Sequence, residues 1–288
     1  MAIRIGISGW RYAPWRGVFY PEGLAQRREL EYASRAFASI EINGSFYSLQ
    51  SPASWAQWRD QVPDGFVFAV KGPRFITHML RLRRVDRALA NFFASGLLQL
   101  GPKLGPLLWQ FPPDFRFEPE GFDAFLALLP RDTDAALALA RRRDRTLMAG
   151  RCALPSQPPR PIRHAVEIRH ESFRDARFIR LLRRHNVALV LADTAGRFPY
   201  GEDITADFTY LRLHGAEELY VSGYDDGALD WWRARIRAWA AGGEPADAAR
   251  FAPLAPRRRA SRDVYCYFDN DAKVHAPFDA ANLARRLA

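Results

Sequence analysis

Short apolar segments that end in turn residues recur eight times along this chain, and most are followed by a segment with helical periodicity. Strands that alternate with helices pair in parallel, because each helix returns the chain to the start of the next strand. Eight such units in 288 residues predict a single-domain (β/α)8 TIM barrel spanning residues 1–288. The expected strands cover residues 3–8, 40–43, 66–71, 105–111, 165–169, 187–193, 209–214 and 264–268.

An open doubly wound sheet is the alternative fold for such a pattern. That fold usually carries a glycine-rich phosphate loop after its first strand, and Gly6-Ile7-Ser8-Gly9 matches only a fragment of one. The loops after the first four strands are long, as expected where strand-to-helix loops build the functional face of a barrel. Two helix-to-strand connections, 130–164 and 242–263, are rich in arginine and proline and are predicted to be solvated excursions. The expected helices cover residues 29–37, 53–62, 85–98, 121–129, 173–185, 229–241 and 276–287.

The charge balance favours an anionic partner. There are 42 basic and 32 acidic residues, a formal net charge of +10, which is typical of chains that bind phosphorylated metabolites or nucleic acid. Only Lys71, Lys103 and Lys273 are lysines, so the other 39 basic residues are arginines. A GC-rich genome would produce that bias without any such partner, so composition alone leaves nucleic acid as an open alternative to a small anionic substrate.

The same composition excludes several classes of protein. With 48% hydrophobic and 26% charged residues, the chain is neither disordered nor collagen-like nor a simple coiled coil. No stretch of 18 apolar residues predicts a membrane span, and the first ten residues lack the regions of a signal peptide. Two cysteines, Cys152 and Cys266, form no disulfide framework and no zinc motif. We therefore expect a cytoplasmic protein, with its oligomeric state left open.

Side chains alternate between the two faces of a strand, and in a barrel the apolar face meets the helices. In the strand at 165–169, Val166 and Ile168 occupy that outer face, so Glu167 and Arg169 are predicted to point into the barrel. The same reasoning applied to the other strands adds Glu41, Asn43, Lys71, Gln110, Tyr210, Arg212 and His214. Buried charges cost free energy unless they pair or bind a ligand. Their number predicts a polar site at the C-terminal end of the barrel, although a self-neutralising structural network is the alternative.

We assign candidate roles to these residues by their chemistry. No residue is assigned as a metal ligand, and no cofactor is identified. Arginine and lysine suit a phosphate or carboxylate, while carboxylates and imidazoles suit proton transfer. Lys71 is also a candidate for imine formation, although neighbouring carboxylates are expected to raise its pKa. The catalytic candidates are Glu41, Lys71, Glu167, Asp193 and His214. The substrate-binding candidates are Trp10, Asn43, Tyr47, His78, Gln110, Arg169, His170, Arg212 and Asn270.

Aromatic residues are dense in the loop after the first strand. They could stack a ring-shaped ligand, or they could anchor the loop through a small core of their own. Arg81, Arg83 and Arg84 lie in another loop of the same face and could contact nucleic-acid phosphates. The aromatic residues of the first loop are Trp10, Tyr12, Trp15, Phe19 and Tyr20.

Taken together, these motifs resemble those of the YecE-like family, a domain of unknown function (number 72). The resemblance covers nearly the whole chain and implies a TIM barrel, but it supplies no activity. Here Phe173 stands where a tryptophan is common, and Asp269 where the family has an asparagine. The matching motifs are Ile5 to Trp10, Phe19-Tyr20-Pro21, Glu41-Ile42-Asn43, Phe68-Ala69-Val70-Lys71, Glu167-Ile168-Arg169-His170, Tyr210 to Gly215 and Tyr267 to Asp271.

Four functions remain open at this point. The first is an enzyme of the hydrolase, lyase or isomerase type that acts on an anionic small molecule. The second adds a divalent metal, with oxygen and imidazole ligands drawn from Glu167, Asp193, His214 and Asp269 or Asp271. The third is a nucleic-acid-processing or nucleic-acid-binding barrel, and the fourth is a ligand-binding protein without catalysis.

Overall fold

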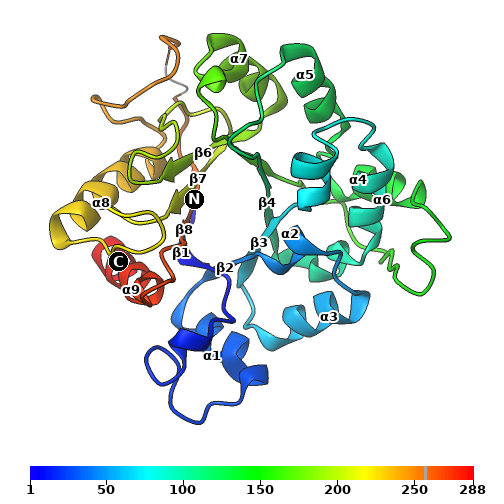
Figure 1. Cartoon of the computed structure of the whole chain (residues 1–288), viewed down its shortest axis with the longest axis horizontal. Helices are drawn as coiled ribbons and strands as arrows, with labels where there is room; N and C mark the ends of the chain where they lie inside the picture. Colours follow the sequence, from blue (N-terminus) through cyan, green and yellow to red (C-terminus); the bar gives the residue numbers. More distant parts are fainter. Residues whose placement is uncertain (256–257) are drawn as a thin grey trace.

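Eight parallel strands close into a barrel in chain order, with β8 pairing back onto β1, in a computed structural model that describes residues 1–255 and 258–288. Figure 1 looks along the barrel and shows the ring of strands surrounded by helices. The predicted fold is therefore confirmed. The strands are β1 (Ile3–Ser8), β2 (Ser39–Ile42), β3 (Val67–Lys71), β4 (Leu104–Gln110), β5 (His164–Glu167), β6 (Ala188–Asp193), β7 (Phe208–Leu213) and β8 (Asp263–Phe268).

The α-helices begin and end at residues that favour helix termini. Ser51 accepts a hydrogen bond from Ser54 N ahead of α3, and Asp225 accepts one from Ala228 N ahead of α8. Asn186 adopts a left-handed conformation (φ 50°) after α7, as is common just past a helix. The α-helices are α1 (Glu29–Ala36), α2 (Gly44–Tyr47), α3 (Pro52–Gln61), α4 (Asp86–Ala94), α5 (Pro119–Leu128), α6 (Thr133–Arg141), α7 (Ala176–His185), α8 (Asp226–Ala240) and α9 (His275–Leu287).

Short helical turns complete the connections. Most are single 3-10 turns, and the segment after β3 is one turn of π-helix. The turns are η1 (Ala13–Trp15), η2 (Gln26–Arg28), η3 (Phe75–Met79), η4 (Leu97–Lys103) and η5 (Glu171–Phe173).

Two predictions about the helices were wrong. The segment 130–164 is not simply a solvated excursion, because it contains α6, which packs against α4 and buries Ala136 and Leu139. The helix expected over 85–98 ends at Ala94, since Gly96 turns left-handed (φ 98°) and a 3-10 turn follows. Within the connection expected at 242–263, residues 256–257 lie outside the described part of the chain.

Two hydrophobic clusters hold the barrel together. One fills the layer between strands and helices and includes Trp55, Trp109 and Trp239. The other lies inside the barrel, where side chains such as Ala69 and Phe208 close the lower part. The buried charged side chains of the interior lie beyond this apolar part, at the C-terminal ends of the strands, called the mouth below. None of the helices in the described residues has the length and apolar character needed to cross a membrane.

Candidate functional site

Arg212, on β7, lies at the centre of the mouth and is completely buried. Its Nη2 lies 2.9 Å from Glu41 Oε1 and 2.8 Å from Asp269 Oδ2, and its Nη1 lies 2.7 Å from Glu167 Oε2. One guanidinium thus binds three carboxylates supplied by β2, β5 and the end of β8. These four residues are called the Arg212 cluster.

Both glutamates of the cluster accept from further donors, on both oxygens of Glu41 and on Oε1 of Glu167. Glu41 and Glu167 are fully buried, so water does not reach them. This environment fits a role in positioning Arg212 better than the general-base role expected from the sequence. The additional donors are the Ser8 hydroxyl (2.6 Å) and the Tyr210 hydroxyl (2.6 Å) on Glu41, and the Gln110 amide (2.7 Å) and the Arg169 Nε (3.0 Å) on Glu167.

The carboxylates of the cluster are held in their charged form. Burial opposes the charge on Glu167, yet Arg212 and Arg169 outweigh it and keep the pKa of this carboxyl well below its usual range. Burial likewise opposes the charge on Asp269, and Arg212 and His214 lower its pKa in the same way. The buried charges of the Arg212 cluster therefore compensate one another, as expected for a self-neutralising structural network. Such a network does not account for Lys71.

Lys71, at the end of β3, is the amine that this network leaves without a partner. Its Nζ lies 4.2 Å from the centroid of the Phe46 ring. No hydrogen bond or ion pair joins this Nζ to another residue described in the structure. Burial and the charge of Arg212 lower the pKa of Lys71 to about 8, outweighing Glu167, Glu41 and Asp269. The carboxylates do raise this pKa, as expected from the sequence, but their effect is smaller than the combined effect of burial and Arg212.

His214 directly follows β7 at the mouth and is fully buried. Its Nδ1 is 3.0 Å from Asp269 Oδ2, and its Nε2 is 3.4 Å from Arg212 Nη1. Both ring nitrogens therefore face members of the Arg212 cluster. His214 is placed to orient Asp269 rather than to meet a substrate directly.

Two further titratable groups belong to the mouth. His78, in the π-helical turn after β3, packs edge-on against Phe46, and its Nδ1 lies 2.8 Å from the Thr77 hydroxyl. Burial and the nearby Lys71 lower the pKa of His78 to about 4, so its imidazole is neutral at neutral pH. Burial and the Asp269 carboxylate raise the pKa of Asp271 to about 6, in the range suited to proton transfer.

The pKa of Asp271 predicts a dependence of stability on pH. The ordinary value for aspartic acid is about 4, so between about pH 4 and pH 6 the folded chain keeps a proton that the unfolded chain has lost. The contribution of Asp271 to stability therefore falls as the pH rises through that window. In urea denaturation, we expect the free energy of unfolding of Asp271→Asn to rise relative to that of the wild type as the pH increases from roughly 4 to 7. A difference that stays constant over this range would contradict the assignment.

Three of the predicted residues lie away from the Arg212 cluster. Asp193 accepts a hydrogen bond from the Tyr224 hydroxyl (2.9 Å) beside a separate aromatic cavity. Asn270 donates to Asp279 Oδ2 (2.8 Å) and to a backbone carbonyl, so it anchors α9. His170 caps the short turn η5 by accepting from the Ser172 backbone N–H. Each of these side chains bonds to a nearby loop or helix, and alternation along a strand does not predict such contacts.

The predicted residues of the first two loops are also separated. Asn43 reaches the mouth and donates to the Ser8 hydroxyl (2.9 Å). Trp10 packs edge-on against Trp58 at the border of a side cavity of about 270 Å³. Tyr47 is 69% exposed and lies outside the Arg212 cluster.

The other aromatic residues of the first loop form a core of their own. Trp15 and Tyr20 are buried, Phe19 packs between them and Phe37, and the Tyr20 hydroxyl donates to the Trp10 carbonyl (2.6 Å). Of the two alternatives for these residues, the anchored loop is the one that the structure shows.

The set of metal ligands considered for the second hypothesis is not assembled. No group of three or more histidine, cysteine, aspartate or glutamate side chains in residues 1–255 and 258–288 is arranged to hold a metal ion. The reason is geometric: Arg212 occupies the space between Glu167 and Asp269, and Asp193 points toward Tyr224. A guanidinium at the centre of these carboxylates supplies the positive charge that a cation would otherwise supply.

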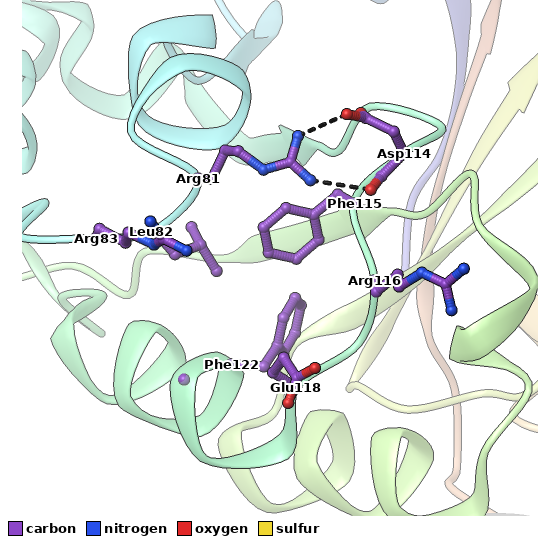
Figure 2. A pocket seen from close by; sticks show the side chains of 9 residues that line it. Arg81, Leu82, Arg83, Asp114, Phe115, Arg116, Glu118 and Phe122 are labelled. Carbon is purple, nitrogen blue, oxygen red and sulfur yellow. Dashed lines mark hydrogen bonds and ion pairs between the residues drawn. The ribbon is translucent and has the colours of Figure 1, made fainter.

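A separate cavity of about 330 Å³ lies between the loops after β3 and β4 (Figure 2). Arg81 crosses it to bind Asp114 Oδ2 (2.9 Å) and the Asp114 carbonyl (2.9 Å), while Arg116 points away from Phe115. One of the three arginines considered for nucleic-acid binding is thus neutralised within the chain. Arg83 and Arg84 are exposed beside it.

A more open cleft of about 550 Å³ adjoins the mouth and is called the arginine cleft. Arg169 donates from Nη2 to the Tyr220 hydroxyl (3.1 Å), which places Tyr220 between the cleft and the Arg212 cluster. Arg197 is exposed, and no hydrogen bond or ion pair joins its guanidinium to any residue described in the structure. The lining residues are Pro113, Arg169, Arg197, Phe198, Glu218, Leu219 and Tyr220.

Backbone strain is concentrated on the same face. Of the seven non-glycine residues with positive φ in the described part of the chain, six lie in loops that follow a strand, and Asn186 is the exception. Tyr220 (φ 66°) is one of the six, held by a hydrogen bond from its backbone N–H to the His214 carbonyl (2.5 Å). Such conformations cost about 1–3 kcal/mol each and persist mostly at functional sites. The strained loops thus indicate the same end of the barrel as the buried charges.

Sequence reasoning missed several residues of the site, and it considered Asp269 only as a metal ligand. Ser8 and Asp269 continue the inward alternation of Arg4-Gly6-Ser8 and Tyr265-Tyr267-Asp269, so the existing pattern could have placed both inside the barrel. Tyr220 and Arg197 lie in loops without periodicity, and no feature of the sequence indicates where they point. The structure therefore adds the cleft to a cluster that alternation largely predicts.

The fold and the mouth together define a (β/α)8 barrel protein with a polar pocket at the C-terminal ends of its strands. The family described as "Protein of unknown function DUF72" matches residues 4–288, and the chain belongs to that family. The resemblance to the YecE-like family is confirmed.

Curated relatives agree with this assignment over part of the chain. The UPF0759 protein YecE of Escherichia coli strain K12 is 31% identical over 113 residues, 39% of each chain. The UPF0759 protein YunF of Bacillus subtilis strain 168 is 30% identical over 118 residues, 39% of this chain and 41% of that protein. The match thus spans about two fifths of the length of these relatives.

Solved structures share the fold over the whole chain. A DUF72 family protein from Thermotoga maritima superposes with a TM-score of 0.70 and 24% identity, covering 100% of this chain and 99% of the other. One from Enterococcus faecalis gives a TM-score of 0.67 and 16% identity, covering 99% and 95%. At these identities the likeness establishes the fold alone.

Proposed function

We propose that this chain is an enzyme that acts on an anionic or phosphorylated small molecule at the mouth of the barrel, by hydrolase, lyase or isomerase chemistry. The arginine cleft carries the proposal, because Arg197 has no counter-ion in the described chain and faces a pocket shared with Arg169. Guanidinium groups bind carboxylates and phosphates through paired hydrogen bonds. Glu218 also lines the cleft and is exposed, and its negative charge partly offsets the positive charge of the two arginines.

Titratable groups at the mouth support catalysis rather than binding alone. Asp271 and Lys71 have pKa values of about 6 and about 8, on either side of neutrality. Groups tuned in this way cluster at catalytic sites. The cysteines Cys152 and Cys266 are unpaired, which fits our proposal that the protein works in the reducing cytoplasm.

The proposal predicts the effect of removing Arg197. We expect Arg197→Ala to weaken the binding of inorganic phosphate about tenfold in isothermal titration, because a charge-assisted hydrogen bond contributes about 1.5–3 kcal/mol and exposure reduces this. Arg237→Ala is the matched control, since it removes the same charge from an exposed residue in the last turn of α8, at the opposite end of the barrel.

Equal losses in the two variants would show that only net charge matters and would reject the cleft. The same titration with single-stranded oligonucleotides tests the nucleic-acid alternative, in which affinity falls steeply with salt. Screening phosphorylated metabolites for turnover then separates an enzyme from a binding protein.

A further inference from the structure

We infer that Lys71 forms a covalent imine with the carbonyl carbon of an anionic aldehyde or ketone bound at the mouth. The inference rests on the proposed function, which supplies the expectation that the substrate is anionic. It narrows the class of substrate to carbonyl compounds. Its basis is the position of one buried amine beside carboxylates that are all bound to another cation, Arg212.

The surroundings of Lys71 leave its amine free to react. One side of Nζ faces the Phe46 ring at 4.2 Å, which excludes water without offering a strong acceptor. The carboxylates that could have formed an ion pair with it are bound to Arg212 instead, at 2.7–2.9 Å. A desolvated lysine beside another cation is a known arrangement for a nucleophilic amine.

The identity of the residue supports the same conclusion. This chain uses arginine at 39 of its 42 basic positions, and arginine would satisfy a need for charge alone. Lys103 donates to the carbonyls of Arg59 and Val62 at 2.8 and 2.7 Å, and Lys273 is exposed. At Lys71 no such hydrogen bonds explain the choice, whereas lysine, unlike arginine, can lose its proton near neutral pH.

The chemistry is balanced without a cofactor. The lone pair of the neutral amine forms a bond to the carbonyl carbon, and the C=O π electrons move to oxygen. A proton then passes from the nitrogen to that oxygen, which gives a neutral carbinolamine. A second proton on that hydroxyl lets it leave as water, and the nitrogen lone pair forms the C=N bond of a protonated imine. This cation draws electrons from an adjoining C–H or C–C bond, which is lyase or isomerase chemistry. Water reverses the addition and releases the amine.

The test uses reductive trapping on the wild-type protein. Sodium cyanoborohydride converts an imine into a stable secondary amine, and the three lysines lie far enough apart to be distinguished by peptide mapping. The probes are glyoxylate, an anionic aldehyde, and acetaldehyde, a neutral one of similar size. A lysine with a pKa of about 8 has roughly a hundredfold more free amine at neutral pH than an ordinary lysine. We expect glyoxylate to label Lys71 at least about tenfold faster than Lys273.

Two internal references make the result specific. The terminal amine of Met1 is exposed and lies outside the mouth, so preferential labelling of Lys71 over it reports the site. The rate at Lys71 should also level off above about pH 8. Lys71→Arg keeps the charge and should lose the adduct at this position alone.

The outcomes separate the inference from the proposed function. Preference for glyoxylate at Lys71, lost in Arg197→Ala, supports both. Equal labelling of Lys71 by the two aldehydes supports the imine and overturns the anion cleft. Failure to label Lys71 in a protein that still binds phosphate overturns the imine and leaves the cleft intact.

Discussion

Arg212→Met is expected to lower the free energy of unfolding at pH 7 by about 3–5 kcal/mol, the loss typical of a buried ion pair deprived of one partner. The guanidinium is completely buried and binds Glu41, Glu167 and Asp269. Without it, three carboxylates face one another with little water. Urea denaturation of both proteins measures the difference.

The pH dependence of this loss identifies its origin. Because the folded wild type depresses the pKa values of Glu167 and Asp269, these groups contribute stability above their unfolded values near pH 4. That contribution disappears as the pH falls through the folded values, so the two proteins should converge at acidic pH. Arg28→Met, at an exposed Arg28–Glu31 pair, is the control and should change nothing measurable. A loss that does not shrink in acid would indicate lost packing instead.

Gly6→Ala is expected to destabilise the barrel by about 3 kcal/mol, at the upper end for an added methyl group. Gly6 pairs with Ser39 where β1 meets β2, and a Cβ at this position would lie 1.9 Å from the Ser39 carbonyl oxygen. Relief requires the two strands to separate, which breaks their hydrogen bonds. Thermal and urea unfolding both report the loss.

The same substitution at Gly121 is the matched control. Gly121 is exposed within α5, and an added Cβ would meet nothing within 4 Å. We expect Gly121→Ala to stabilise the protein by about 0.5–1 kcal/mol, because alanine loses less backbone entropy in a helix. Similar effects at the two positions would mean that the close approach of β1 and β2 is not rigid.

Much of the candidate site was accessible from alternation along the strands. Glu41, Gln110, Glu167 and Arg212 were predicted to point inward from the apolar character of their neighbours, and the structure places all four inside the barrel. Their roles were harder to predict, because a role depends on which atoms meet. Glu41 was a candidate base, yet its oxygens are bound to Arg212, Ser8 and Tyr210.

Loops account for most of what could not be predicted. Asp193 and Asn270 follow strands at the correct end of the barrel, but each turns toward a neighbouring helix or loop. Arg197 and Tyr220 come from loops without periodicity, and the Tyr220 hydroxyl accepts a hydrogen bond from Arg169, which is distant in sequence. Local propensity carries no information about such contacts.

The sequence by itself determined the barrel and the charged character of its interior, because both follow from periodicities of two and 3.6 residues that burial enforces locally. The tertiary structure alone decided which charges cancel. Arg212 neutralises the carboxylates because closure of the barrel brings β2, β5, β7 and the end of β8 within hydrogen-bonding distance of one another. Lys71 is left without a partner for the same reason, since its surroundings are set by distances between strands that no single segment encodes.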